Sequence, residues 1–211
     1  APNRTRRQLP DRYRLITSRE STPGFSFSAM SILHCGRYRL SLERPLIMGI
    51  VNLTPDSFSG DGTGTDVDRA IRLARRQFEA GADILDIGAE SSRPGAIQTP
   101  EDEELRRLLP VLREIVDWGV PLSVDTYKPA VMRAALDAGA AMINDISALR
   151  HSGALAAVAG SDCAICLMHM QGEPGTMQVA PHYDDVVREV RDFLAERVAC
   201  CREAGIDANR L

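Results

Sequence analysis

The stretch LIMGIVN, residues 46–52, is a continuous apolar run that ends in a polar residue. A run this short and this apolar is typical of a strand that is covered on both faces, as in parallel sheets. The same change from apolar to polar recurs along the chain, at Asn52, Glu90 to Arg93, Asp125, Asn144 with Asp145, and His169. In parallel α/β folds the carboxyl ends of the strands carry the chemistry, so the sequence predicts an enzyme.

Patterns typical of amphipathic helices separate these runs. The first helix is predicted over about 67–78, with Asp66 as its N-cap and Gly81 as its C-cap. The second has Thr99 as a possible cap and Pro100 at its first position, and Pro110 should kink or restart it. The other predicted elements are strands at 84–87, 121–125, 141–146 and 163–168 and helices at 129–138, 153–159 and 183–204.

The resulting order is five βα units, which implies an α/β fold with a parallel sheet that is either doubly wound or closed into a barrel. Polar residues follow every strand in order, and no Gly-x-Gly-x-x-Gly turn follows the first strand. Both features favour a (β/α)8 TIM barrel. A complete barrel needs about 250 residues, so residues 30–211 are expected to form an incomplete barrel domain that further residues or another chain would complete.

The first 29 residues differ in composition from the rest. They carry six Arg against Asp11 and Glu20, a net charge of +4, whereas the remainder carries −8. They show no periodic apolar face, so residues 1–29 are expected to be a disordered basic extension, with an organelle presequence as the alternative. The overall charge of −4 argues against a nucleic-acid partner. No apolar run is long enough to cross a membrane, so a cytoplasmic protein without membrane contacts is predicted.

The five cysteines do not form a regular pattern. An odd number without regular spacing is not a disulfide framework. Cys163 and Cys166 have the spacing of a metal or redox pair, but side chains three apart on a strand point to opposite faces. Both are therefore predicted to be buried structural cysteines.

Two loops that follow the predicted strands carry groups suited to phosphate or metal. The loop from Asn52 to Gly62 contains Asp56 and Ser57, and its Gly and Pro content suits a lid, although an ordinary turn explains it equally well. The segment ESSRPG, residues 90–95, combines an Arg with two hydroxyls, a common set for binding anions. A solvated loop is the alternative.

Asp125 and Asn144 each end an apolar strand and should therefore be partly buried. A buried polar side chain needs a partner. One carboxylate with one amide can bind a flat heterocycle that has adjacent donors and acceptors, and bonding to nearby loop backbone is the alternative. His169 could carry a proton, but a structural role is favoured.

Taken together, these segments resemble the dihydropteroate synthases of folate biosynthesis. The resemblance covers residues 36–211. It rests on the motifs MGIVNLTPDSFS (48–59), DIGAESSRPG (86–95), SVDT (123–126), IND (143–145) and LMHMQG (167–172). It implies a (β/α)8 barrel that joins p-aminobenzoate to 6-hydroxymethyl-7,8-dihydropterin diphosphate and releases diphosphate with the help of Mg²⁺. It also implies a target of sulfonamides.

The resemblance also implies roles for individual residues. Asn52 would hold the metal and diphosphate, Ser92 and Arg93 would contact the phosphates, Asp125 and Asn144 would bind the pterin, and Asp56, Phe58 and Pro94 would belong to two loops that close over the site, with Phe58 and Pro94 near the p-aminobenzoate ring. Asp56, Arg93 and Asp125 are the predicted catalytic residues.

The family's further site residues follow its strands six to eight, and its last helices form a homodimer interface. This sequence ends before both, so a non-catalytic pterin-binding homologue or partner subunit is the alternative to the synthase.

Overall fold

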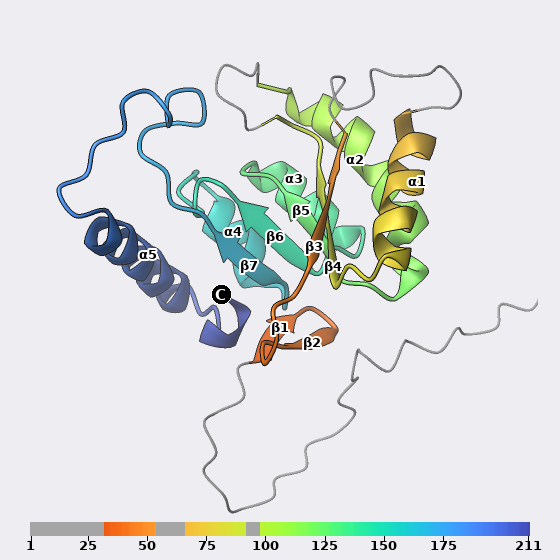
Figure 1. Cartoon of the computed structure of the whole chain (residues 1–211), viewed down its shortest axis with the longest axis horizontal. Coiled ribbons are helices and arrows are strands. Elements are labelled where there is room, and N and C mark those ends of the chain that lie inside the picture. The colour runs from red at the N-terminus through yellow and green to blue at the C-terminus, as the bar shows by residue number, and fades with distance from the viewer. Residues whose placement is uncertain (1–31, 54–65, 92–97) are drawn as a thin grey trace, which may run out of the picture.

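The computed structural model describes residues 32–53, 66–91 and 98–211. Its centre is a parallel sheet in which each strand pairs with the next along the chain (Figure 1). The strands are β3 (Met48–Asn52), β4 (Ile84–Gly88), β5 (Leu122–Asp125), β6 (Met142–Asp145) and β7 (Ala164–Leu167). In a doubly wound sheet the order of the strands would reverse part-way across, although the strands would stay parallel. The sequential order confirms the predicted α/β fold, with five βα units of a (β/α)8 barrel.

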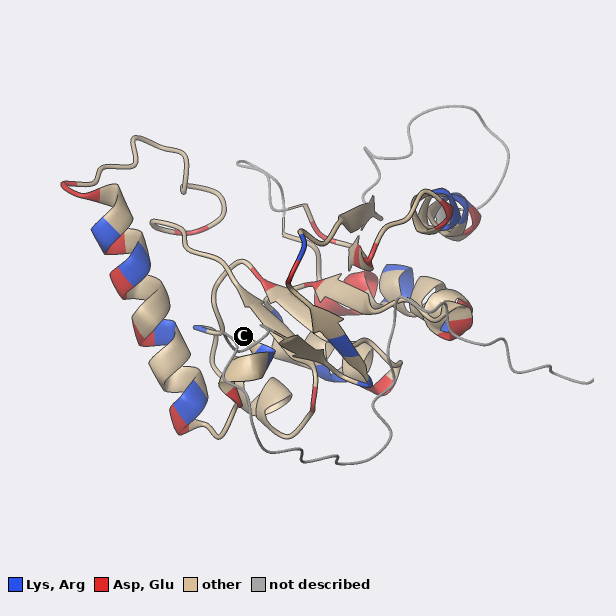
Figure 2. Cartoon of the chain, turned by 60° about the horizontal axis from the view of Figure 1, so that its bottom comes forward, with Lys and Arg blue, Asp and Glu red and all other residues tan. Residues whose placement is uncertain are grey.

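Four helices form a layer on one side of the sheet, and a fifth lies beyond β7 (Figure 1). They are α1 (Asp66–Glu79), α2 (Glu101–Ile115), α3 (Pro129–Asp137), α4 (Ala154–Ala159) and α5 (Val186–Glu203). Charged residues of both signs run along α5 (Figure 2), which is consistent with its largely exposed surface. Within the described ranges, no helix has both the length and the hydropathy needed to cross a bilayer.

The core lies between the sheet and this helix layer. Leu85 and Ile87 of β4 are fully buried there, and so are Leu108 and Leu112 of α2. Burying one such side chain contributes roughly 1.5–3 kcal/mol, so this layer fixes the sheet against the helices. The buried stripe of α2 includes one charged residue, Glu104, which is only 1% exposed.

The start and interior of α2 differ from the prediction. Pro100 is the N-cap rather than the first helical residue, and no side chain caps this end. The acidic first turn of the helix is favourable at the positive end of the helix dipole. Pro110 does not restart the helix, which runs unbroken to Ile115. Burial of the apolar stripe on both sides of Pro110 stabilises one continuous helix despite the missing N–H.

A short hairpin that the sequence analysis did not predict lies at the amino-terminal end of the sheet (Figure 1). It consists of β1 (Ile32–Cys35) and β2 (Tyr38–Ser41), joined by a turn in which Gly36 has φ 56°. The Cys35 thiol donates to the Ala141 carbonyl oxygen at 3.3 Å, and the Tyr38 hydroxyl donates to the Val120 carbonyl oxygen at 3.3 Å. Burial raises the pKa of Cys35 to about 12, so this thiol is structural rather than reactive.

The turn between α3 and β6 depends on a glycine, which gives a testable prediction. Gly139 has φ +96°, and an added Cβ would lie 2.7 Å from Cγ2 of Val116. Gly139→Ala is therefore expected to lower the free energy of unfolding by about 1–2 kcal/mol in denaturant titrations. Gly160→Ala is the matched control, because Gly160 has φ −79° and nothing lies within 4 Å of an added Cβ. An equal loss in both variants would contradict this account.

Candidate active site

One row of paired residues crosses the inner face of the sheet, opposite the helix layer. In this row Asn52 pairs with Gly88, Gly88 with Asp125, Asp125 with Asn144, and Asn144 with Cys166. The row lies at the carboxyl ends of the strands, where parallel α/β folds bind ligands. Three of the predicted site residues, Asn52, Asp125 and Asn144, thus lie side by side on this face.

Gly88 keeps the middle of this row free of a side chain. A Cβ at Gly88 would lie 3.5 Å from Oδ1 of Asn52 and 3.6 Å from Oδ2 of Asp125. The missing side chain therefore lets an amide oxygen and a carboxylate approach the same point from its two sides. Mg²⁺ commonly takes only one or two protein oxygens and completes its shell with water and phosphate. The Asn52 oxygen fits such a role. No group of three or more His, Cys, Asp or Glu side chains suited to a metal occurs among the described residues.

Asp86 lies deeper on the same face and orients Asn144. The Asn144 Nδ2 donates to Oδ2 of Asp86 at 3.2 Å. Because this bond uses the amide nitrogen, the Asn144 carbonyl oxygen is left as an acceptor for a ligand. Oδ1 of Asp86 and Oγ of Ser123 are buried and have no partner of good hydrogen-bond geometry within the described part of the chain. Burial raises the pKa of Asp86, and the nearby Ser123 hydroxyl and the Asn144 amide oppose this rise.

Asp125 has a strongly shifted acidity. Burial raises its pKa to about 7, and the nearby carboxylates of Asp86 and Glu104 add to the rise. Near neutral pH the empty site therefore contains both forms of this carboxyl group. A ligand that donates hydrogen bonds or carries positive charge would select the ionised form.

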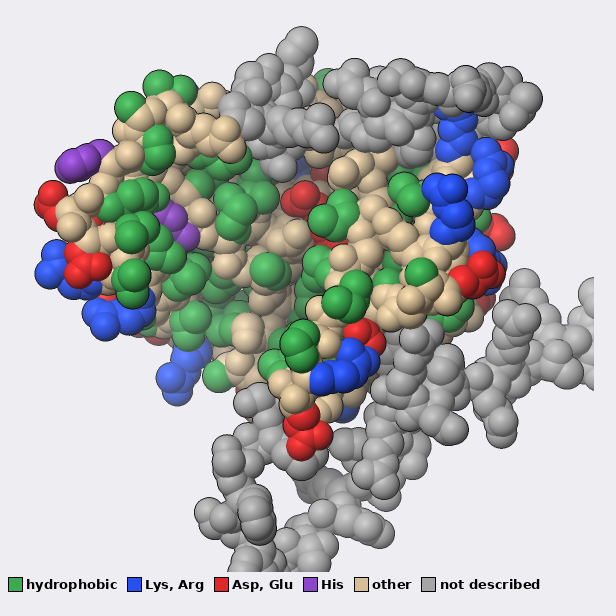
Figure 3. Space-filling model, viewed as in Figure 1, with side chains coloured by type: hydrophobic (Ala, Val, Ile, Leu, Met, Phe, Trp, Pro, Cys, Tyr) green, Lys and Arg blue, Asp and Glu red, His purple; other side chains and the backbone are tan. Residues whose placement is uncertain are grey.

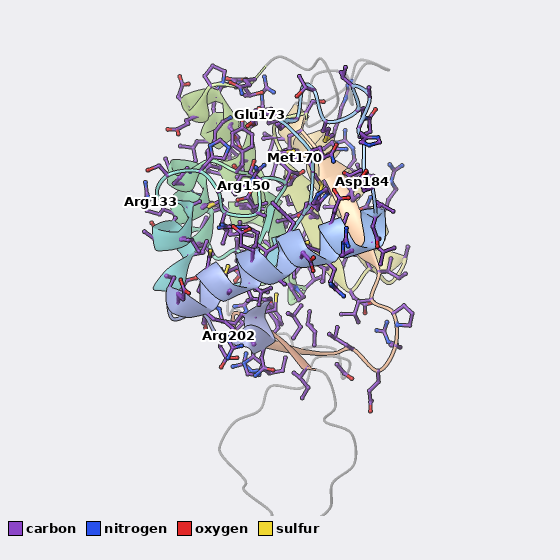
Figure 4. All side chains as sticks on the ribbon, turned by 90° about the vertical axis from the view of Figure 1, so that its left-hand side faces the viewer. Arg133, Arg150, Met170, Glu173, Asp184 and Arg202 are labelled. Carbon is purple, nitrogen blue, oxygen red and sulfur yellow. The ribbon has the colours of Figure 1, made fainter. Side chains whose placement is uncertain are left out.

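A cavity of about 410 Å³ opens at Asp125, the one member of this row among its lining residues. Its volume is within the range of small-molecule sites. Asp125 lines it from the end of β5, Ile146 from the residue after β6, and Glu90 and Ser91 from the exit of β4. Glu173, labelled in Figure 4, lines it from the loop after β7. Figure 3 shows acidic side chains on this face beside a wide area of apolar ones. The cavity is lined mainly by polar side chains, four of them carboxylates, with Ile146 and Pro174 as apolar contacts, so it favours a ligand that donates several hydrogen bonds.

Comparison with known proteins assigns this arrangement to a family. Residues 48–211 match the family described as pterin binding enzyme. The chain belongs to the pterin binding enzyme family. It is similar to the dihydropteroate synthase of Escherichia coli (strain K12), with 48% identity over 173 residues that cover 82% of this chain and 61% of the relative. The Neisseria meningitidis serogroup B synthase is 47% identical over 186 residues, covering 87% of this chain and 65% of the relative.

Solved structures of pterin binding enzymes agree with this assignment. The dihydropteroate synthase of Xanthomonas albilineans, solved with 4-aminobenzoic acid, has a TM-score of 0.80 and 55% identity, covering 87% of this chain and 65% of that one. The Burkholderia cenocepacia synthase complexed with 7,8-dihydropteroate has a TM-score of 0.76 and 53% identity, covering 85% and 61%. This chain therefore spans about three fifths of the length of the relatives that it matches.

Several residues expected to act in a pterin binding enzyme lie outside the described residues. These are Asp56, Phe58, Ser92, Arg93 and Pro94. Conversely, sequence reasoning did not single out Asp86. The signal was present, because an Asp inside the apolar strand ILDIG must be buried and therefore needs a ligand or a partner.

The remaining polar residues that follow the strands have structural contacts. Asp145 accepts hydrogen bonds from the backbone of its own turn. His169 packs edge-on against Phe193 of α5, with ring centroids 4.9 Å apart, which supports the structural role favoured from the sequence. Cys163 is buried as predicted, but the prediction is wrong for Cys166, which is exposed. Cys166 lies on the inner face of β7, which pairs on only one side in the described sheet.

Proposed function

We propose that this chain carries the pterin-binding half of a dihydropteroate synthase, which joins p-aminobenzoate to 6-hydroxymethyl-7,8-dihydropterin diphosphate. The observation that carries the proposal is the row of side chains at the strand ends, in which the oxygens of Asn52 and Asp125 flank Gly88 and Asn144 follows next. The family match and the names of the relatives support the same reaction. The alternative is a non-catalytic pterin-binding homologue.

The pterin ring would bind to Asp125 and Asn144. A pterin has donors and acceptors along its edges. The Asp125 carboxylate accepts from ring N–H groups, and the Asn144 carbonyl oxygen, held by the bond to Asp86, adds a second acceptor. A charge-assisted bond to a partly buried carboxylate is among the stronger contacts that a site can offer.

The diphosphate would lie toward Asn52. Asn52 would contribute one oxygen to a bound Mg²⁺, which neutralises charge on the leaving diphosphate. Ser92 and Arg93, which follow β4 in the sequence, would donate hydrogen bonds to the phosphates. Together these contacts stabilise diphosphate as a leaving group.

In the proposed reaction the amine nitrogen of p-aminobenzoate forms a bond to the pterin methylene carbon, and the bond from that carbon to the diphosphate oxygen breaks. The amine releases one proton. Positive charge develops on the pterin methylene as diphosphate departs, and the Asp125 carboxylate, together with Asp56 from the loop after β3, would stabilise it. The arylamine is already neutral at pH 7, so no strong base is needed. Phe58 and Pro94 would contact its ring and exclude water.

Two relatives were solved with small molecules that bear on the second substrate. The Xanthomonas albilineans synthase was solved with 4-aminobenzoic acid and the Yersinia pestis synthase with a sulfonamide drug. We infer that sulfonamides compete with p-aminobenzoate at this chain's site as well. A homodimer and a cytoplasmic location stay predictions of the resemblance and of the sequence.

The proposal is tested by product formation. The chain would be incubated with Mg²⁺, the pterin diphosphate and labelled p-aminobenzoate, and labelled dihydropteroate is expected. Asn144→Leu should abolish the product, whereas Asn209→Leu, the same change at an exposed residue, should not. Pterin binding without product would favour the non-catalytic homologue, and absence of both would reject the proposed function.

A further inference from the structure

A buried ion cluster lies beside the candidate site. It consists of Lys128, Glu90, Glu104 and Tyr127, here called the Lys128 cluster. The Lys128 ammonium donates to Oε2 of Glu90, to the Thr99 carbonyl oxygen, and to Oε2 of Glu104 at 2.7 Å. The side chains of Lys128 and Glu90 are each 11% exposed, and that of Glu104 is 1% exposed. Lys128 Nζ, which follows β5, therefore binds one acceptor after β4 (Glu90) and two at the start of α2 (Thr99 and Glu104).

Glu90 is held through both of its carboxylate oxygens. Lys128 donates to one oxygen, and the Tyr127 hydroxyl donates to the other, Oε1, at 2.9 Å. Both donors come from the segment that directly follows Asp125. Two bonds fix the orientation of a carboxylate as well as its distance, so the position of Glu90 is tied to that of Asp125.

Stability alone does not account for the cluster. Lys128 faces two carboxylates, which outweigh the effect of burial and raise its pKa. Oε1 of Glu104 is buried and has no partner of good hydrogen-bond geometry among the described residues, although the Thr126 side chain lies near enough to lower the pKa of Glu104. Replacing buried ion pairs by apolar side chains of similar volume is often neutral or stabilising. An apolar residue at position 104 would also continue the buried stripe of α2 formed by Leu108 and Leu112.

The cluster borders the cavity of the proposed site. Glu90, Ser91 and Asp125 line the same cavity. Ser91 leads directly into Ser92 and Arg93 in the sequence, whereas Asp125 stands in the row that faces the pterin. Any shift of Glu90 and Ser91 relative to Asp125 would change the shape of this cavity.

We propose that Lys128 is a positioning residue that holds the exit of β4 at a fixed distance from the exit of β5, so that one substrate can reach both. This inference rests on the proposed function, in which Asp125 binds the pterin and the segment after Ser91 binds the diphosphate. Lys128 then contributes to the binding of ligands that span both ends and contributes little to the binding of the pterin alone. A purely structural role would affect both kinds of ligand equally.

The test compares two probes by calorimetry in the presence of Mg²⁺: 6-hydroxymethylpterin and its diphosphate. Lys128→Met is expected to weaken binding of the diphosphate about tenfold, with a change of less than about twofold for the pterin alcohol. Lys128→Arg keeps the charge and should restore most of the affinity. Arg106→Met is the control, because it breaks an exposed ion pair with Glu103 on the same helix and should change neither affinity.

A second variant that removes a single hydroxyl tests the inference even if Lys128→Met does not fold. Tyr127→Phe removes only the hydroxyl that bonds to Glu90, and about a threefold loss is expected for the diphosphate alone. Unchanged binding in the folded variants, or an equal loss for both probes, would overturn the inference and leave the proposed function standing. If the unsubstituted chain binds neither probe, the proposed function fails and the inference fails with it.

Discussion

Asp125→Asn is expected to weaken pterin binding about 100-fold and, at the same time, to stabilise the folded chain at alkaline pH. The loss of affinity follows because the ionised carboxylate is the group that accepts ring N–H donors, and an amide of the same shape offers only one acceptor. Charge-assisted hydrogen bonds of this kind contribute about 1.5–3 kcal/mol, and a hundredfold change corresponds to about 2.7 kcal/mol.

The gain in stability follows from the sign of the pKa shift. The pKa of Asp125 is about 7 in the folded chain against 3.8 for an ordinary Asp, chiefly because of burial. The folded state therefore binds this proton more tightly than the unfolded state, and ionisation destabilises the fold progressively between about pH 4 and pH 7. Asn does not titrate. The difference in unfolding free energy between the variant and the parent chain should therefore grow in favour of the variant by about 2 kcal/mol as the pH rises from 5 to 8.

Calorimetry with a pterin and urea titrations at pH 5 and pH 8 measure both effects. Asp137→Asn is the matched control, since Asp137 ends α3 and is exposed. It should change neither the affinity nor the pH dependence. If Asp125→Asn binds pterin normally, this carboxylate is not the pterin acceptor. If the variant loses stability at pH 8, burial of the ionised carboxylate does not destabilise the fold.

Asp145→Ala is expected to lower the free energy of unfolding by about 3 kcal/mol, the largest loss anticipated for a polar residue of the sheet. Asp145 is fully buried and accepts from the backbone N–H groups of Ser147 at 2.7 Å and Leu149 at 2.8 Å. The turn that it holds is strained, because Ala148 and Leu149 have φ of 52° and 56° without being glycines. Truncation leaves two buried donors without partners in a turn that other residues do not favour.

The geometry of the turn gives this prediction a close control. Arg197 of α5 holds the same turn from outside, donating from Nε to the Ala148 carbonyl oxygen at 2.9 Å, so α5 should loosen together with the turn. Asp207 makes the same kind of bond, to the N–H of Asn209 at 2.8 Å, but on the surface. Asp207→Ala should therefore lose less than about 1 kcal/mol in denaturant titrations. Comparable losses at the two positions would mean that burial and strain do not matter here.

The order of the elements was predictable because each helix and strand has its own local pattern. The apolar run at 46–52 ends at Asn52 in the structure as in the sequence, and Gly139 closes α3 with φ +96°. Parallel pairing of successive strands then places Asp125 beside Asn144 without further information. The hairpin before β3 was missed because its two strands are short and its stability comes from contacts with distant residues such as Ala141 and Val120.

The Lys128 cluster could not be predicted from the sequence. Lys128 and Glu90 are 38 positions apart, and Lys128 and Glu104 are 24 apart, so no local periodicity connects them. Glu104 gave a weak signal, because it occupies a position of the apolar stripe of α2. Cys166 is exposed on β7, which pairs only with β6 in the described sheet. The sequence of the strand does not show which strands lie beside it, so this exposure could not be predicted.

A crystal structure of the chain with 6-hydroxymethylpterin would show whether the row from Asn52 to Asn144 binds a pterin. The ring is expected above the inner face of the sheet, with its N–H groups donating to the Asp125 carboxylate and to the Asn144 carbonyl oxygen, and with its methylene directed toward Asn52. A pterin bound elsewhere, or a ring in the cavity without contact to Asp125 and Asn144, would contradict this binding mode.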